Sequence, residues 1–171
     1  MKIRVIDGDI SIVKADALIT AINSGASVAG SVDFAVYRRN THYHTMLQEA
    51  IETKPLAELS TFVATAPVRT RLAFGDIVFV IDDTSHPLRR VVSAGLTGAH
   101  AAEKQRVCMP VMRSGAALGR RENTIKQVVN EIGIGIRMFR DETKRPAIKD
   151  LTIVTYDDPD TLALLRKNLR V

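Results

Sequence analysis

The sequence predicts an α/β fold in which a largely parallel or mixed central sheet is covered by helices on both faces. Short runs of Ile, Val, Leu and Ala recur along the whole chain. In the second half of the chain these runs alternate with longer segments whose apolar residues have helical spacing. The run at 16–22 is almost wholly apolar, as expected of a strand that is buried on both faces.

The length and composition indicate one domain, residues 1–171. A chain of 171 residues can bury a continuous core without disulfides or a metal ion. The only cysteine, Cys108, lies in an apolar run and excludes an internal disulfide, which favours a reducing cytoplasm. The N-terminal segment turns acidic at Asp7 before a signal-peptide core could form, and no apolar run approaches the ~18 residues of a membrane span. We therefore expect a soluble cytoplasmic protein with no membrane contact.

Four strands and two helices are predicted in the first half of the chain. The strands are expected at 2–6, 16–22, 62–67 and 76–82, and a polar turn at 69–75 joins the last two. A loop of Gly, Ser and Ala at 24–31 separates the second strand from two helices. Apolar positions at helical spacing place these helices at 32–39 and 42–53.

The second half of the chain predicts three helices and two strands. Ser85 is a residue type favoured at helix N-caps and Pro87 suits a first turn, which predicts a helix over 86–104. A strand at 106–112 is followed by the loop RSGAALG and by a long helix that Gly133 and Gly135 should weaken. A strand at 150–157 and a helix opened by Asp158-Pro159 complete the chain.

Four short motifs near the N-terminus have the order and spacing of a known family signature. They are Gly8-Asp9-Ile10-Ser11, Ala15-Asp16-Ala17-Leu18-Ile19, Ala21-Ile22-Asn23-Ser24 and Gly30-Ser31-Val32-Asp33. With these motifs the chain resembles macro domains, which are ADP-ribose-binding modules with a three-layer α/β/α fold. In that family an Asn at a strand end and an Asp after a Gly-rich loop stand ten positions apart, as Asn23 and Asp33 do here. The remainder of the chain resembles the family more weakly.

The resemblance implies an ADP-ribose site. Asp9 would accept a hydrogen bond from the adenine amino group, and the Ile10 backbone would read the ring edge. Small residues let backbone N–H groups turn toward a diphosphate, and a helix that begins near Ser31 adds the positive end of its dipole. The implied ligand-binding residues are Asp9, Ile10, Gly30, Ser31 and Val32, with Ser114, Gly115, Ala116, Ala117 and Leu118 on the facing loop.

Asn23 and Asp33 are the catalytic candidates that the resemblance implies. Asn23 would orient the distal ribose, and Asp33 would polarise a water that attacks the anomeric carbon and releases mono-ADP-ribose from acidic side chains of proteins. The residues alone allow another interpretation, in which Asn23 forms strand-end hydrogen bonds and Asp33 favours the N-terminus of a helix.

Departures from the family pattern favour binding over catalysis. Thr20 stands where the family has an Asn, the glycine run is reduced to Val28-Ala29-Gly30-Ser31, and the second loop lacks the usual aromatic residue. The alternative is a non-catalytic reader of ADP-ribose or a related nucleotide. The expected partners are ADP-ribose or an ADP-ribosylated protein.

A third hypothesis, association with nucleic acid, rests only on the formal net charge of +5. The sequence has no Trp, five Phe and three Tyr, so it supplies few rings for base stacking. His42 and His44 are two positions apart on a predicted helix, point in different directions and are expected to be exposed. No metal ion and no cofactor are expected.

Overall fold

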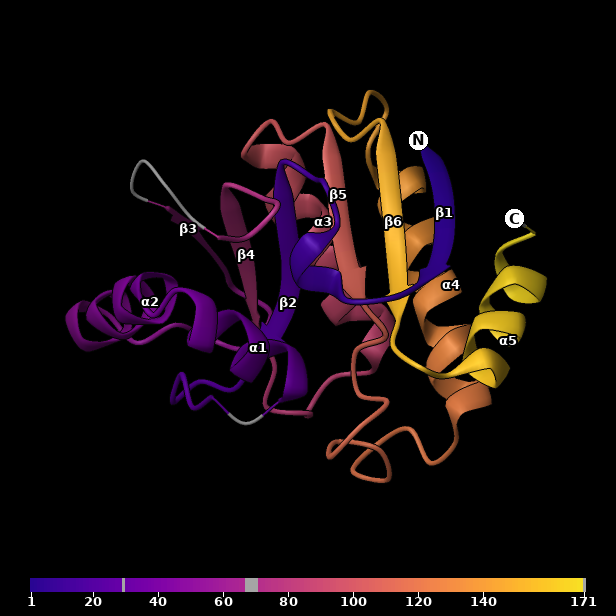
Figure 1. The fold of residues 1–171 in the computed structure, drawn as a ribbon, viewed down its shortest axis with the longest axis horizontal. Coiled ribbons are helices and arrows are strands. Elements are labelled where there is room, and N and C mark those ends of the chain that lie inside the picture. The colour runs from indigo at the N-terminus through magenta and orange to yellow at the C-terminus, as the bar shows by residue number, and fades with distance from the viewer. Residues whose placement is uncertain (29, 67–70, 171) are drawn as a thin grey trace.

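The structure is a computed structural model that describes residues 1–28, 30–66 and 71–170. These residues form six strands, five α-helices and one short 3-10 helix (Figure 1). In chain order the elements are β1 (Lys2–Asp7), η1 (Ile10–Ile12), β2 (Ala17–Ile22), α1 (Ser31–Arg39), α2 (His42–Thr53), β3 (Thr61–Thr65), β4 (Asp76–Ile81), α3 (Leu88–Ala101), β5 (Arg106–Pro110), α4 (Ile125–Glu142), β6 (Asp150–Thr155) and α5 (Pro159–Leu169).

The strands form one mixed sheet in the order β1-β6-β5-β2-β4-β3. β3 is antiparallel to β4, and all other neighbouring strands are parallel. The predicted mixed central sheet is therefore confirmed. The carboxyl ends of the five parallel strands meet at one edge, at the bottom of Figure 1. This is the edge at which open α/β sheets bind ligands.

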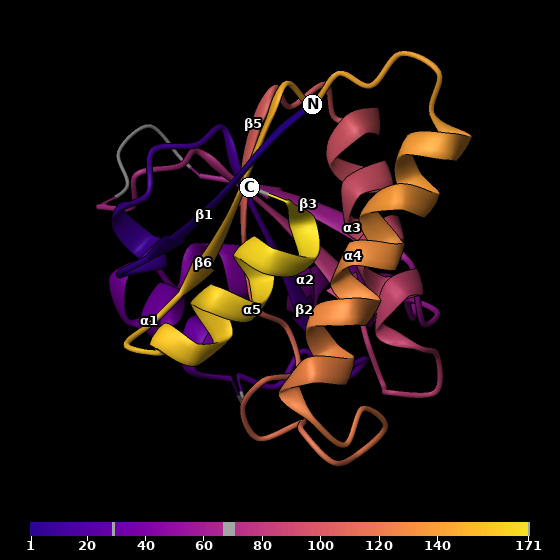
Figure 2. The same ribbon diagram turned by 90° about the vertical axis from the view of Figure 1, so that its right-hand side faces the viewer.

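Helices cover both faces of the sheet, as predicted (Figure 2). Ile19 of β2 and Val80 of β4 pack into a core shared with α3, α4 and α5. Leu18 and Phe79, their neighbours in sequence, face the other way into a core shared with α1 and α2. Because successive side chains of a strand point to opposite faces, two buried faces require the unbroken apolar runs seen in the sequence.

Gly135 and Gly95 bring α3 close to its neighbours. A Cβ atom at Gly135 would lie 2.6 Å from the carbonyl oxygen of Arg89 and 2.8 Å from the Cβ of Val92, both on α3. A Cβ atom at Gly95 would lie 2.5 Å from a methyl group of Ile19. The sequence suggests that Gly135 weakens its helix, but α4 is continuous there, and the missing side chain is what lets α3 and α4 pack together.

Most predicted element boundaries agree with the structure within three residues, and the difference at α3 has a local cause. The predicted helix over 86–104 begins at Leu88 and ends at Ala101, and Pro87 rather than Ser85 is its N-cap. The Ser85 N–H donates to Glu58 at 2.8 Å, so this residue belongs to a loop. The predicted turn at 69–75 and the end of the predicted strand at 62–67 lie partly outside the described residues.

His44 is buried, which corrects the expectation that it is exposed. Its side chain is 1% exposed and lies between the rings of Tyr37 and Phe79, with centroid distances of 5.4 and 5.3 Å. Both ring nitrogens lack a hydrogen-bond partner among the described residues. Burial lowers the pKa of His44, so its imidazole is neutral near pH 7. The position faces the sheet because α2 buries Tyr43, His44 and Leu47 on one side.

Across the described ranges, no helix combines the length and the apolar character that a bilayer crossing requires.

Candidate functional site

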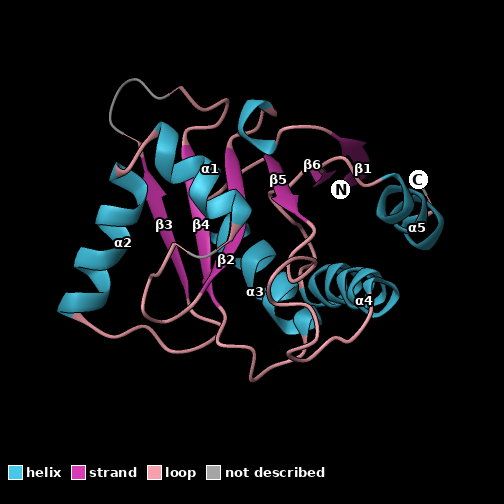
Figure 3. Ribbon diagram, turned by 60° about the horizontal axis from the view of Figure 1, so that its bottom comes forward, coloured by secondary structure: helices cyan, strands magenta, loops and turns pink. Residues whose placement is uncertain are grey.

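A cleft follows the carboxyl edge of the sheet, between α1 and the loop after β5. Figure 3 shows these two flanking segments. It consists of two adjoining cavities of about 400 and 460 Å³. We call them the Asp9 cavity, which lies over the ends of β1 and β6, and the Asp33 cavity, which lies over the ends of β2 and β4. Both are lined by Ser31, Val32, Pro110, Val111 and Ser114. The shared wall makes the two cavities one elongated site.

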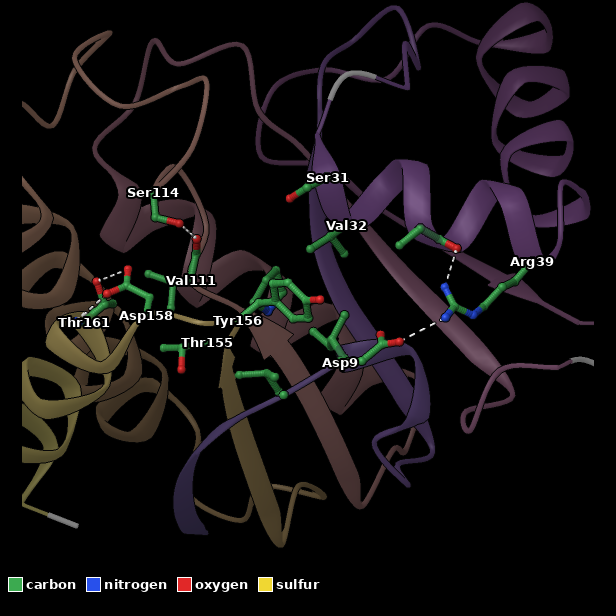
Figure 4. Close-up of a pocket in the computed structure, with 15 residues that line it drawn as sticks. Asp9, Ser31, Val32, Arg39, Val111, Ser114, Thr155, Tyr156, Asp158 and Thr161 are labelled. Atoms are coloured by element: carbon green, nitrogen blue, oxygen red, sulfur yellow. Dashed lines mark hydrogen bonds and ion pairs between the residues drawn. The ribbon is translucent and has the colours of Figure 1, made fainter.

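Asp9 presents an oriented carboxylate in the first cavity. One carboxylate oxygen accepts hydrogen bonds from the backbone N–H and the hydroxyl of Ser11 at 2.9 and 2.6 Å. The other oxygen pairs with Arg39 at 2.9 Å (Figure 4). The Ser11 hydroxyl is the main cause that lowers the pKa of Asp9, and Arg39 adds to the effect. Asp9 is therefore an ionised acceptor in a fixed position, and Ile10 lines the cavity beside it.

Tyr156 also lines the Asp9 cavity and was not found by sequence reasoning. It follows β6 directly, is 77% exposed, and lines the same cavity as Asp9 and Val111 (Figure 4). Large exposed rings in a concave site provide a flat apolar surface for a ligand. The only signal in the sequence is an aromatic residue at the end of a predicted parallel strand.

Asn23 begins the first loop, of which residues 23–28 and 30 are described. Its side-chain oxygen accepts hydrogen bonds from the N–H groups of Gly25 and Ser27 at 3.0 and 3.2 Å, and its amide nitrogen lies 3.4 Å from the Ser27 carbonyl oxygen. The Ala26 N–H donates to the Asn23 carbonyl at 2.9 Å. The small residues at 25 and 26 therefore direct their N–H groups into the loop itself. The amides that begin α1, at Ser31 and Val32, are the ones that border the cleft and have no helical partner.

Asp33 lies in the first turn of α1 and lines the second cavity. Its side chain is 6% exposed, and one carboxylate oxygen lies 3.3 Å from the hydroxyl of Thr20. Burial raises the pKa of Asp33 to about 6, although hydrogen bonds from Thr20 and the Gly30 backbone act in the opposite direction. A carboxylate with this pKa is mostly ionised at pH 7 and is a stronger base than an ordinary Asp. Asn23 lines the same cavity, so the fold brings the two catalytic candidates to one site.

The second loop, residues 111–124, forms the opposite wall of the cleft. Ser114, Gly115, Ala116 and Ala117 line the Asp33 cavity. The N–H groups of Gly115, Ala116 and Ala117 donate to no group in the described part of the chain, so they are free to bind a ligand. Leu118 behaves differently from the other four predicted residues. It packs against the core beside α3 and α4 and does not line the cleft.

Arg113, Asp82 and Glu122 form a buried ionic network behind this wall. The Arg113 guanidinium donates to both carboxylate oxygens of Asp82 at 2.9 and 2.5 Å and to Glu122 at 2.8 Å. Their side chains are only 2%, 5% and 6% exposed. Sequence reasoning missed this network because its members lie on segments that only the folded chain brings together.

The fold and the cleft define an α/β protein with an elongated ligand site at the carboxyl edge of its sheet. The chain superposes on a macrodomain mutant of Oceanobacillus iheyensis with a TM-score of 0.77 and 13% identity, over 97% of this chain and 89% of that chain. A Trypanosoma brucei macrodomain in complex with ADP gives 0.77 and 15%, over 98% of this chain and 68% of that one. The same macrodomain in complex with ADP-ribose gives 0.75 and 15%, over 96% and 68%. The chain has the macrodomain fold.

No protein-family model and no curated protein sequence matches the chain.

Proposed function

We propose that residues 1–171 form a single macro-like domain that binds ADP-ribose, either free or attached to a protein. The arrangement of the cleft carries this proposal. An ionised acceptor, Asp9, lies at one end, and the buried acid Asp33 lies at the other. Free backbone amides line the wall between them. The Trypanosoma brucei macrodomain of the same fold is in complex with ADP-ribose, which agrees with this arrangement.

Each part of ADP-ribose has a complementary group in the cleft. The adenine amino group donates to Asp9, and the exposed Tyr156 ring stacks on the base. The diphosphate accepts hydrogen bonds from the first amides of α1 and from residues 115–117 of the second loop. No Lys is needed for this binding, because oriented N–H groups and the helix dipole both favour an anion. The distal ribose then occupies the Asp33 cavity.

A hydrolytic step is the second part of the proposal. Asp33, with its raised pKa, takes a proton from a water that attacks the anomeric carbon of the distal ribose, and the carboxylate of the acceptor side chain leaves. Asn23 orients the ribose after its amide releases the 3.4 Å contact to Ser27. If Asn23 instead keeps its loop hydrogen bonds with ligand bound, the protein is a reader that binds without hydrolysis.

The one cysteine supports the proposed location of the protein in the cytoplasm. Cys108 is buried, and burial raises the pKa of its thiol to about 12, so the thiolate form is rare. A chain that folds without a disulfide suits a reducing compartment, and we place it in the cytoplasm.

Calorimetric titration with ADP-ribose tests the binding proposal. Saturable heat is expected with the wild-type protein, and Asp9→Asn should weaken binding by roughly 1–3 kcal/mol because a charged acceptor is lost. Asp160→Asn is the matched control, because this exposed Asp lies outside the cleft on α5. Absence of heat at ligand concentrations near ~1 mM, with the protein folded, would rule out biologically useful binding.

Release of label from a mono-ADP-ribosylated acidic acceptor tests the hydrolytic step. The wild-type protein should release ADP-ribose, and Asp33→Asn should slow release by ~10²–10⁴-fold because the general base is lost. Asp160→Asn again serves as control and should leave the rate unchanged. Equal, slow release by wild type and Asp33→Asn, with binding retained, would identify a reader.

A further inference from the structure

Arg113 borders the cleft, and its side chain donates four hydrogen bonds to other described residues. Its guanidinium makes hydrogen bonds to Asp82, to Glu122 and to the carbonyl oxygen of His86, the last at 2.9 Å. The residue borders the Asp33 cavity, but its side chain is 2% exposed. The guanidinium is therefore occupied by the protein and is not presented to a ligand.

The network joins three segments that meet at the carboxyl edge of the sheet. Asp82 follows β4 directly, and its N–H donates to the carbonyl oxygen of Ile22 at the end of β2. Glu122 lies near the end of the second loop, and its other oxygen accepts the N–H of Leu88, which begins α3, at 2.9 Å. Arg113 lies near the start of the same loop. The ion pair between Arg113 and Glu122 therefore clamps the two ends of the loop together, and Asp82 ties the clamp to the sheet.

The backbone at Arg113 supports the same interpretation. Its φ is 60°, in the left-handed region that a residue with a side chain rarely adopts. Such a conformation persists only where surrounding contacts hold it. The Ser114 N–H, next in the chain, donates to the Val111 carbonyl oxygen, and the three residues that follow carry the N–H groups of the wall that have no partner in the described part of the chain: Gly115, Ala116 and Ala117. The direction of those N–H groups thus depends on a strained residue that the ion pairs hold in place.

We propose that Arg113 is a positioning residue. Its ion pairs with Asp82 and Glu122 hold residues 114–117 in the conformation that binds a diphosphate, without any contact between Arg113 and the ligand. This inference rests on the proposed function for the identity of the ligand. A preorganised wall binds more tightly because the entropy of ordering the loop is lost on folding rather than on binding.

Arg113→Lys is the test variant, because Lys keeps the charge and loses the planar fork that reaches both acids. Arg121→Lys is the matched control: it lies in the same loop, is exposed, and donates to a single carbonyl oxygen, that of Ser85. Calorimetry gives the Kd of each protein for ADP-ribose and for AMP, which lacks the second phosphate and the distal ribose. Amide hydrogen exchange is measured at Ser114 and Leu118, whose N–H groups donate to the carbonyl oxygens of Val111 and Gly115, and the melting temperature is measured on the same samples.

Arg113→Lys should raise the Kd for ADP-ribose by ~10-fold or more and the Kd for AMP by less than ~2-fold, because only the diphosphate depends on the ordered wall. Exchange at Ser114 and Leu118 should be faster than in wild type, and Arg121→Lys should match wild type in every measurement. An unchanged Kd for ADP-ribose in a folded variant would overturn the proposal. An equal loss for both ligands would also overturn it, because it would indicate a general structural role.

The exchange measurement separates this proposal from the proposed function. If wild type binds no ADP-ribose, faster exchange in Arg113→Lys alone still supports the positioning role, and unchanged exchange refutes it. If Arg113→Lys does not fold, Glu122→Gln replaces it in the same experiments. That variant leaves the two bonds from Arg113 to Asp82 intact and removes one charge, and the same shifts in Kd and exchange are expected from it.

Discussion

The two loops that face each other across the cleft are held in place by different physical means. The first loop is held by the Asn23 side chain, which bonds to N–H groups two and four residues ahead, and these bonds are exposed to solvent. The second loop is held by Arg113 and Glu122, whose ion pairs are buried and reach to β4 and α3. A local polar turn contributes little to stability and adapts easily, whereas a buried charge network stabilises a loop only while all its members are present.

Two adjacent residues after β4, Asp82 and Asp83, each bond to a different one of the two loops. Asp82 pairs with Arg113 of the second loop in the protein interior. The carboxylate of Asp83 accepts the backbone N–H of Ser24 in the first loop at 2.9 Å, at an exposed position. The same residue type therefore supports both walls from one place in the fold, and the two contacts differ in burial and in the charge of the partner. Substitutions in the two loops and at their contacts test this difference in stability.

The largest effect is expected from removal of the charge at the centre of the buried network. Arg113→Met should lower the free energy of unfolding by about 3–5 kcal/mol at pH 7, because the carboxylates of Asp82 and Glu122 would remain buried without a positive charge beside them. Urea unfolding measures the change. Arg121→Met is the control and should shift the free energy by less than about 0.5 kcal/mol. Similar values for the two variants would show that the second loop is not held by its buried charges.

Removal of the charge of Asp33, which follows the first loop, should raise the free energy of unfolding, whereas removal of the Arg113 charge lowers it. Its folded-state pKa of about 6 lies above the ordinary value of 3.8 for an aspartate, so the folded state binds the proton more tightly than the unfolded state. The contribution of Asp33 to stability is therefore highest below pH ~4, falls as the pH rises toward 6, and is least favourable above that. Asp33→Asn should stabilise the protein at pH 7 by up to about 3 kcal/mol and by much less near pH 4.

Denaturant midpoints of wild type and Asp33→Asn at the two pH values check this prediction, with Asp160→Asn as the control. A variant that is less stable than wild type at pH 7 would show that the buried carboxylate is compensated in the folded state. In that case the buried charges on both walls of the cleft would be compensated by their surroundings. The two walls would then differ in stability by less than their burial indicates.

Asn23→Ala should have an intermediate effect. The loss of its two hydrogen bonds to Gly25 and Ser27 should lower the free energy of unfolding by about 1 kcal/mol, because solvent can replace the lost acceptor at this exposed site. Hydrogen exchange should become faster at Gly25 and Ser27 and remain unchanged at residues 114–118. A change at 114–118 would show that the two loops are coupled.

The smallest effect is expected from Asp83→Asn. The neutral side chain can still accept the Ser24 N–H, and the contact is exposed, so the free energy of unfolding should change by less than about 0.5 kcal/mol. Asp82→Asn, the same substitution one position earlier, should cost several times more because its partner Arg113 is buried. Thermal unfolding of the two variants side by side gives the comparison, and equal shifts would contradict it.

The order and type of the elements could be predicted because each is encoded locally. Buried positions repeat with the period of the strand or helix that contains them. This repeat is visible in the apolar runs of β2 and β4 and in the helical spacing of the apolar residues of α4. Errors arose where a tertiary contact overrides the local signal. His44 looks like a polar surface residue, but α2 turns it toward the sheet, and Gly135 looks like a weak point, but it allows α3 and α4 to pack.

The same distinction between local signals and tertiary contacts applies to the candidate site. The sequence by itself determined the α/β class, and it indicated Asp9 and Asp33 as candidate site residues, because these acids lie within short motifs whose spacing is visible along the chain. Only the tertiary structure decided that Tyr156 lines the same cavity as Asp9, that the Asn23 amide holds its own loop, and that Leu118 faces the core. It also decided that Arg113 meets acids from two other positions in the sequence. The energy of a buried charge depends on which partners the fold brings within hydrogen-bonding distance, and no local pattern records that distance.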